Sequence, residues 1–128
     1  MDFQFERFTD VEASYVARVT VRQTGQFGFN SGAKNRFGLA DYDYSILYFD
    51  PDKRVVGIEL LREMCDDSIQ IKKSDANTYI PSRNFCEKYG IDYSESHRYE
   101  LKQDPKSGVL YFELDKELKA RKKKAAPT

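Results

Sequence analysis

The sequence predicts a β-rich α+β fold in which two tandem β-turn-α-ββ repeats share one barrel-like core. Three observations indicate this fold: alternating apolar and polar strand segments, short helical segments that end at glycine, and an internal similarity at an offset of about fifty residues. The 128 residues suit one domain. A single repeat of about 45 residues would bury too little apolar surface to be stable alone, so we expect a common core. The duplicated domain is expected over 1–114, with repeat 1 at about 15–62, repeat 2 at about 69–114 and a basic, disordered tail at 115–128.

Repeat 1 opens with a strand, because apolar and polar side chains alternate over Tyr15–Arg22. A turn at Thr24–Gly25 follows, and then a short helix with Asn30 or Ser31 as its N-cap. Gly38 stands where a left-handed residue ends a helix. The repeat closes with a hairpin, whose predicted strands are Ser45–Phe49 and Val55–Leu60 around the turn Asp50–Asp52.

Repeat 2 presents the same features in the same order. The strand Ile69–Lys72 leads to a short helix with Ser82 as N-cap, and Gly90 ends that helix as Gly38 ends the first. Asp104-Pro105 matches Asp50-Pro51, and the predicted hairpin strands are Arg98–Lys102 and Val109–Leu114. The shared order favours a duplication; the alternative is that two such stretches look alike without common origin.

The charge distribution follows the repeats. Lys plus Arg and Asp plus Glu are both 21, so the net charge is zero. The first half of each repeat is nevertheless basic and the second half acidic, and the end of the chain is basic. If the basic halves share one face, that face would contact phosphate; the alternative is a solvated surface with clustered charge. The acidic remainder argues against strong non-specific affinity for nucleic acid.

The segment Val19–Asn30, the short helix, Phe37-Gly38-Leu39 and the following hairpin resemble the AbrB-type swapped-hairpin motif. The resemblance covers residues 16–60 and extends to 69–114 through the internal repeat; a tandem pair resembles the MraZ-type regulators. It implies a DNA-binding transcriptional regulator in which two motifs interlock. Matched position by position, the implied DNA contacts are Arg18, Arg22, Lys34 and Arg36 in repeat 1 and Lys72, Lys73 and Arg83 in repeat 2. Two departures from the motif are Asn30 in place of the proline before the helix and Asn77-Thr78 in place of the Gly-Gln turn.

No enzyme motif is present in the sequence, so we expect no catalytic activity, no cofactor and no metal. The one histidine, His97, is expected to be an exposed residue at the start of a strand. We expect two free thiols, Cys86 in the core and Cys65 in a polar connector. A nucleophilic role for Cys86 is the least favoured alternative.

No stretch has the pattern of a signal peptide or a membrane span, so we expect a cytoplasmic protein. The leading functional hypothesis is contact with double-stranded DNA through the basic halves. The alternative is a protein-interaction or structural module that has lost DNA binding and uses acidic, tyrosine-rich hairpins. The sequence leaves open whether the chain forms a homodimer or binds a protein partner. The tyrosines concerned are Tyr42, Tyr44, Tyr48, Tyr93, Tyr99 and Tyr111.

Overall fold

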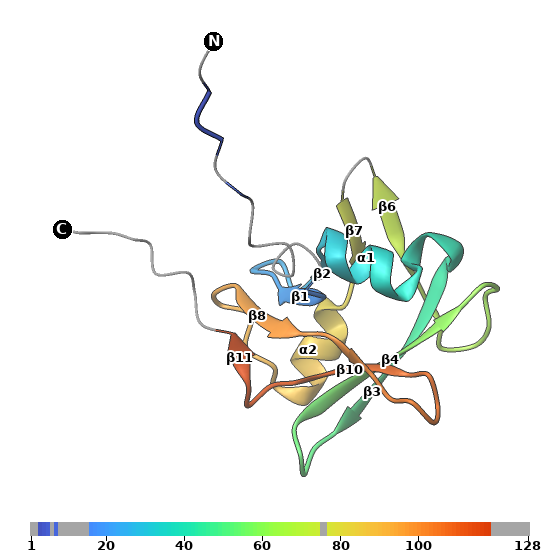
Figure 1. The fold of residues 1–128 in the computed structure, drawn as a ribbon. Helices are drawn as coiled ribbons and strands as arrows, with labels where there is room; N and C mark the ends of the chain where they lie inside the picture. Colours follow the sequence, from blue (N-terminus) through green and yellow to red (C-terminus); the bar gives the residue numbers. More distant parts are fainter. Residues whose placement is uncertain (1–2, 6, 8–15, 75–76, 119–128) are drawn as a thin grey trace.

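The computed structural model describes residues 3–5, 7, 16–74 and 77–118, and these form an α+β fold dominated by two antiparallel sheets (Figure 1). Sheet A has the strand order β11-β8-β1-β2-β7-β6, and sheet B has the order β5-β3-β4-β10-β9. The strands of sheet A are β1 (Arg18–Val21), β2 (Phe27–Phe29), β6 (Lys72–Ser74), β7 (Asn77–Ile80), β8 (His97–Glu100) and β11 (Glu117–Leu118). Those of sheet B are β3 (Tyr44–Asp50), β4 (Val55–Leu61), β5 (Ile69–Gln70), β9 (Lys102–Gln103) and β10 (Leu110–Glu113).

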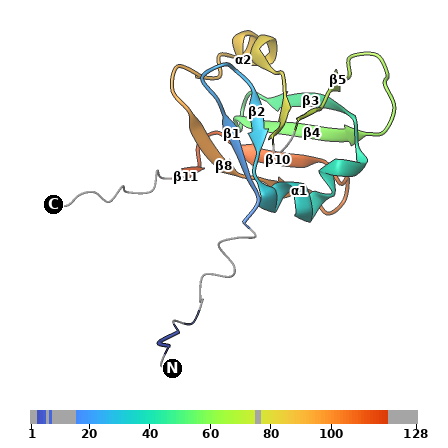
Figure 2. The same ribbon diagram turned by 90° about the horizontal axis from the view of Figure 1, so that it is seen from above.

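Two short helices, α1 (Ser31–Phe37) and α2 (Arg83–Tyr89), lie at opposite ends of the two-sheet body (Figure 2). Gly38 and Gly90 end them in the left-handed conformation, with φ of 62° and 66°, which confirms the predicted helix ends. A single 3₁₀ turn, η2 (Leu39–Asp41), continues directly from α1.

The two helices begin differently. Asn30 is the N-cap of α1, and its side-chain oxygen accepts the N–H of Ala33 at 2.8 Å. Ser82 occupies the N-cap position of α2, but its hydroxyl donates to the carbonyl of Gly25 at 2.7 Å and does not cap the helix. The turn between β1 and β2, at Gly25, is therefore hydrogen-bonded to the start of α2.

The two sheets are joined along both sides by strands that leave one sheet and enter the other. β5 continues into β6 after Ile71, and β8 continues into β9 after Leu101. At these crossing points the N–H of Ile71 donates to the backbone carbonyl of Asp43 at 2.8 Å, and the N–H of Leu101 donates to the backbone carbonyl of Ala17 at 3.0 Å. The backbone is thus hydrogen-bonded where the chain changes sheets.

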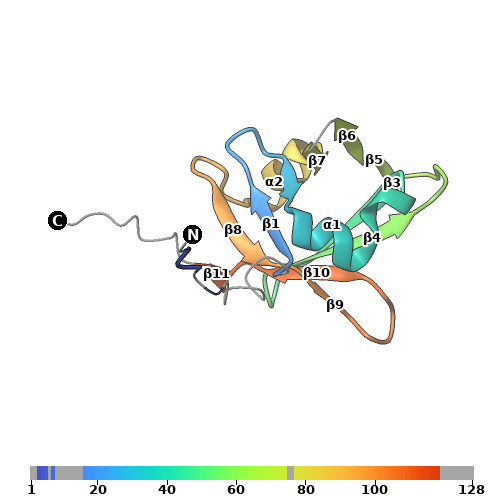
Figure 3. The same ribbon diagram turned by 45° about the horizontal axis from the view of Figure 1, so that its top comes forward.

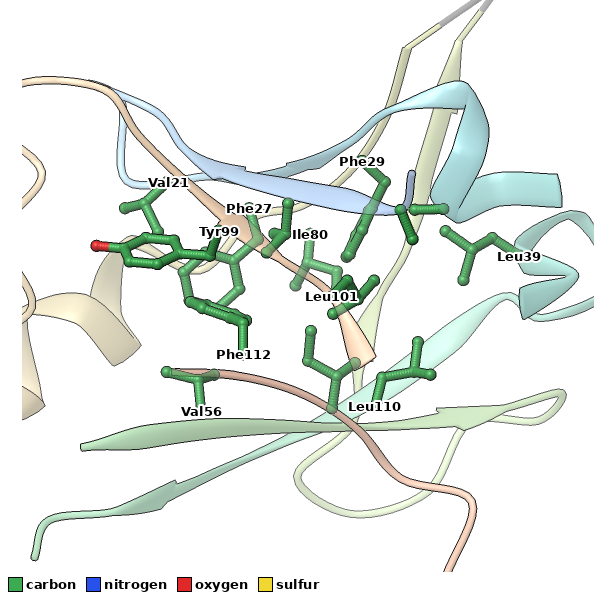
Figure 4. Packing of buried hydrophobic residues seen from close by; sticks show 14 of the residues in the cluster. Val21, Phe27, Phe29, Leu39, Val56, Ile80, Tyr99, Leu101, Leu110 and Phe112 are labelled. Atoms are coloured by element: carbon green, nitrogen blue, oxygen red, sulfur yellow. The ribbon is translucent and has the colours of Figure 1, made fainter. Parts of the chain in front are cut away.

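The core lies between the sheets (Figure 4). The ring of Phe112 on sheet B meets those of Phe27 and Tyr99 on sheet A, with centroids 5.4 and 5.2 Å apart. Phe85 of α2 packs edge-on against Phe27 and closes one end. The alternation predicted for the strands holds in β1, where Val19 and Val21 are fully buried.

The structure differs from the predicted elements in three places. β2 and β7 stand between the turn and the helix of each repeat, where no strand was expected from the residues. The strands predicted over 69–72 and 98–102 are each divided between the two sheets. β11 lies within 115–128, the range predicted to be a tail, because Glu117 and Leu118 pair with β8; residues 119–128 and Tyr15 lie outside the described residues.

Candidate nucleic-acid interface

The side of sheet A that faces away from sheet B carries basic and polar side chains from four strands, and a glycine from a fifth. We call it the outer face of sheet A. Cross-strand partners share one side of an antiparallel sheet, so the registers define a continuous row over β8, β1, β2, β7 and β6 (Figure 3). That row consists of Arg98, Thr20, Gly28, Tyr79 and Lys72.

Two further cations extend this face along β1. Arg18 lies two residues before Thr20 on the same side and is paired in register with Glu100. Arg22 follows β1 directly, and its guanidinium lies over Gly28. Three of the seven predicted contact residues, Arg18, Arg22 and Lys72, are therefore brought to one face.

Arg22 is held in place by neutral groups. Its guanidinium donates to the side-chain oxygens of Asn77 at 2.8 Å and Gln26 at 3.3 Å. It also lies 5.7 Å from the centroid of the Tyr79 ring, within the range of a cation–π contact. Because Gly28 has no side chain, the guanidinium can lie flat on the sheet; a Cβ there would overlap it.

The other four predicted residues lie elsewhere. Lys73 has a partner that the sequence did not suggest, Asp43, whose carboxylate is 3.2 Å from its ammonium. Arg83, on α2, lies 3.4 Å from Glu87 and donates to the hydroxyl of Tyr93 at 3.2 Å. Lys34 and Arg36 are on α1, at the opposite end from Arg83 (Figure 2).

Sequence reasoning missed Arg98 and Tyr79. Arg98 was assigned to an acidic hairpin half, yet β8 pairs with β1 and places it beside Thr20. Tyr79 falls on β7, a strand that was not predicted. The alternation Thr78, Tyr79, Ile80 was the available signal, since Thr78 and Ile80 are buried and Tyr79 is only partly buried.

His97 lies at the first position of β8, as expected, but it is not an exposed residue: only 19% of its side chain is accessible. Its Nδ1 is 2.7 Å from a carboxylate oxygen of Glu117, and its Nε2 is 3.0 Å from one of Asp92. These contacts raise the pKa of His97, chiefly through Glu117. Hydrogen bonds from Ser94 and then from His97 lower the pKa of Asp92 to about 2. Carboxylates therefore contact both ring nitrogens.

The two thiols have different surroundings, as predicted. Cys86 is fully buried and its thiol lies 3.8 Å from the carbonyl of Gly25, whereas Cys65 is exposed. Burial raises the pKa of Cys86 to about 11, so few thiolates form there at neutral pH.

The hairpin tyrosines divide into two groups. Tyr99 is buried in the core, Tyr42 lies beneath the guanidinium of Arg62, and Tyr93 bonds to the Arg83–Glu87 pair. Tyr44, Tyr48 and Tyr111 share the side of sheet B that faces away from sheet A, which we call the outer face of sheet B. No helix or strand of the described chain covers this face (Figure 1).

Two lysines on the outer face of sheet B share one carboxylate. The ammonium of Lys102 lies 3.0 Å from Glu113, and that of Lys116 lies 3.2 Å from the same carboxylate. Both hydrogen bonds lower the pKa of Glu113. The hydroxyl of Tyr48 donates to Glu59 at 2.6 Å, which raises the pKa of Tyr48.

Within the described ranges, no three His, Cys, Asp or Glu side chains come together as a metal site requires. Neither α1 nor α2, the α-helices of the described part, has the length or the apolar character that crossing a bilayer demands. Comparison with protein-family models, with curated proteins and with solved structures finds no match to this chain.

Proposed function

We propose that the protein binds double-stranded DNA through the outer face of sheet A. One observation carries the proposal: Arg18, Arg22, Lys72 and Arg98 lie on this face, and no carboxylate of the described residues forms an ion pair with any of them. Glu100 is the cross-strand neighbour of Arg18, but no ion pair joins the two side chains. Basic side chains outside ion pairs on a solvated face are suited to phosphate. Tyr79, Thr20, Asn77 and Gln26 add polar groups between them.

The dimensions of this face suit a duplex. Four inter-strand steps separate Lys72 from Arg98, which amounts to roughly 19 Å. The major groove of B-DNA is about 12 Å wide, so the two residues could reach the phosphates on both sides of a groove. β-strands are known to enter DNA grooves in other architectures.

The finer fold assignment is part of the same proposal. We infer a duplicated swapped-hairpin motif closed into a barrel by the strands that change sheets. The ladder registers support it: residues that the repeat aligns, Val56 with Leu110 and Ile58 with Phe112, are exchanged in the β4–β10 ladder, where Ile58 faces Leu110 and Val56 faces Phe112. A twofold relation between the repeats would produce this exchange.

Fluorescence anisotropy of labelled duplexes, random and AT-rich, tests the proposal. The full chain is titrated at roughly 50 and 200 mM salt, over which a phosphate binder weakens steeply. In a second protein, the cations of 119–124 are replaced by glutamine, so that the contribution of the tail is measured without shortening the chain. We expect salt-dependent binding that survives this replacement.

Variants then locate the contact. Arg22→Gln should weaken binding and reduce the salt slope by about 0.9 for each lost phosphate contact. Lys102→Gln is the matched control, since it removes one cation from the outer face of sheet B. Equal losses in both variants, or binding that disappears with the tail cations alone, would overturn the assignment to sheet A.

A second function, docking of a protein partner, is favoured by the uncovered outer face of sheet B. Tyr44, Ile46 and Leu61 are only partly buried there, and Tyr48 is 48% exposed. Aromatic side chains of this kind are enriched in protein interfaces. A lack of DNA binding by the full chain, together with a partner whose binding is lost in Tyr48→Ala, would favour this function.

A further inference from the structure

The last strand of the described chain is joined to the fold by a very short ladder. β11 has two residues and pairs only with β8, through Glu117 opposite Tyr99 and Leu118 opposite Arg98. So short a ladder contributes little by itself, because end residues fray. The attachment of β11 therefore depends on side chains.

His97 supplies that attachment. When both ring nitrogens carry protons, the imidazolium donates to Glu117 and to Asp92 at once, at 2.7 and 3.0 Å. Asp92 begins the turn in which its carboxylate also accepts the N–H and the hydroxyl of Ser94. We propose that His97 is a protonation-dependent clasp that fastens β11 and the turn at Asp92 to β8.

Loss of the proton opens the clasp. A neutral imidazole has one N–H, so one of its two nitrogens then presents a lone pair to a carboxylate. The pKa of His97 is raised, so the stability that the clasp contributes is complete below the ordinary pKa of histidine and is lost as the pH rises through the raised value.

Asp92 and Tyr99, which lie beside the clasp, keep their protonation state over this interval. Asp92, with a pKa of about 2, stays ionised, and burial raises the pKa of Tyr99 to about 12. The charges of Arg54 and Asp115, which form an ion pair 3.6 Å apart, also influence the pKa of Tyr99. Glu117 faces the imidazole from β11. Compared with Asp92 and Tyr99, the imidazole is the group that exchanges a proton near neutral pH.

The clasp bears on the candidate interface through Leu118. This residue lies opposite Arg98, at the edge of the outer face of sheet A, and the sequence continues with Lys119, Arg121 and three more lysines. A closed clasp fixes Leu118, the residue that precedes these cations in the sequence, beside the face. Closure would then strengthen DNA binding. This consequence rests on the proposed function, whereas the clasp itself is independent of DNA binding.

Amide hydrogen exchange of the full chain tests the clasp without any ligand. Protection factors of Leu118, the β11 residue whose N–H points toward β8 in this register, are measured between about pH 6 and pH 9, around the range in which histidine titrates. Each is corrected for the intrinsic rate at that pH and compared with β3 amides. We expect the protection of β11 to fall with rising pH while β3 stays protected.

Two variants complete the test. His97→Gln keeps a neutral hydrogen-bonding group, so its β11 should be weakly protected at every pH. Lys73→Gln, which breaks the ion pair with Asp43 at the opposite edge of sheet A, should behave as the native chain does. Protection that is independent of pH in the native chain, or unchanged in His97→Gln, overturns the proposal. DNA titrations at the same pH values are a separate arm: absence of binding at every pH would refute the proposed function and leave the exchange result standing.

Discussion

The outer faces of the two sheets share one local arrangement but differ in how their charged side chains are paired. Each has a glycine opposite a tyrosine: Gly28 faces Tyr79 in sheet A, and Gly57 faces Tyr111 in sheet B. On sheet A the space above the glycine holds the guanidinium of Arg22, whose hydrogen-bond partners are amides. On sheet B the space above the glycine is bordered by Tyr48 and Val109.

This difference in ion pairing makes the outer face of sheet A the better suited of the two to bind an anion. On sheet B, Lys102 and Lys116 both form ion pairs with Glu113, so a ligand would have to compete with existing ion pairs. On sheet A, none of the four cations forms an ion pair with a carboxylate of the described residues, although Glu100 is the cross-strand neighbour of Arg18. Exposed ion pairs contribute little to stability, so this contrast concerns binding more than folding.

The largest expected effect tests whether the two faces belong to one folding unit. Phe112→Ala removes the ring that contacts Phe27 and Tyr99 across the core, and we expect a loss of about 3–5 kcal/mol in the free energy of unfolding. Urea denaturation followed by circular dichroism measures it. Tyr48→Phe, on the outer face of sheet B, is the control and should change stability by less than about 0.5 kcal/mol. A Phe112→Ala loss as small as that of the control would mean that the sheets do not share a core.

A smaller effect is expected at the glycines that end the helices at the two ends of the body. Gly38→Val and Gly90→Val should each cost about 1–3 kcal/mol, because φ values of 62° and 66° disfavour β-branched residues. A Cβ at Gly90 would have nothing within 4 Å, so that variant isolates backbone strain. Gly90→Asn should lose less, since asparagine tolerates this conformation. Thermal melting measures all three, and unchanged melting temperatures in both valine variants would contradict the helix ends.

The smallest effect compares the faces directly. Gly28→Ala should displace the guanidinium of Arg22 without removing its charge, so we expect DNA affinity to fall while the salt slope stays the same. Gly57→Ala is the matched control, because its added Cβ meets Tyr48 and Val109 at 3.4 and 3.5 Å. Anisotropy titrations of both variants measure the difference. Equal DNA affinities for the two variants would show that Arg22, in its position over Gly28, is not part of the interface.

Local signals predicted much of the fold. The helix ends at Gly38 and Gly90 followed from glycine placement, and the strands of the first hairpin followed from the Asp-Pro turn between them. β2 escaped prediction because it has three residues with a glycine at its centre. β11 escaped because Glu117 and Leu118 become a strand only by pairing with β8.

The candidate site was predictable only in part, for a physical reason. Basic residues of the first halves could be found by counting charge, and three of them share a face. Which cations have acidic partners depends on tertiary contacts: Lys73 meets Asp43, thirty positions away, and Arg98 joins β1 across the β8 ladder. The Asp92–His97–Glu117 cluster likewise unites three segments that no spacing rule connects.

The ladders between β2 and β7, β1 and β8, and β4 and β10 all join the first half of the chain to the second. During synthesis, Val19, Val21 and Phe27 are therefore made before the residues that they pack against have been translated. At about 5–20 residues per second, the second half follows the first by roughly 3–12 seconds. In that interval the apolar core residues of the first half lack their partners, and such exposed apolar surface favours aggregation until the second half has been made.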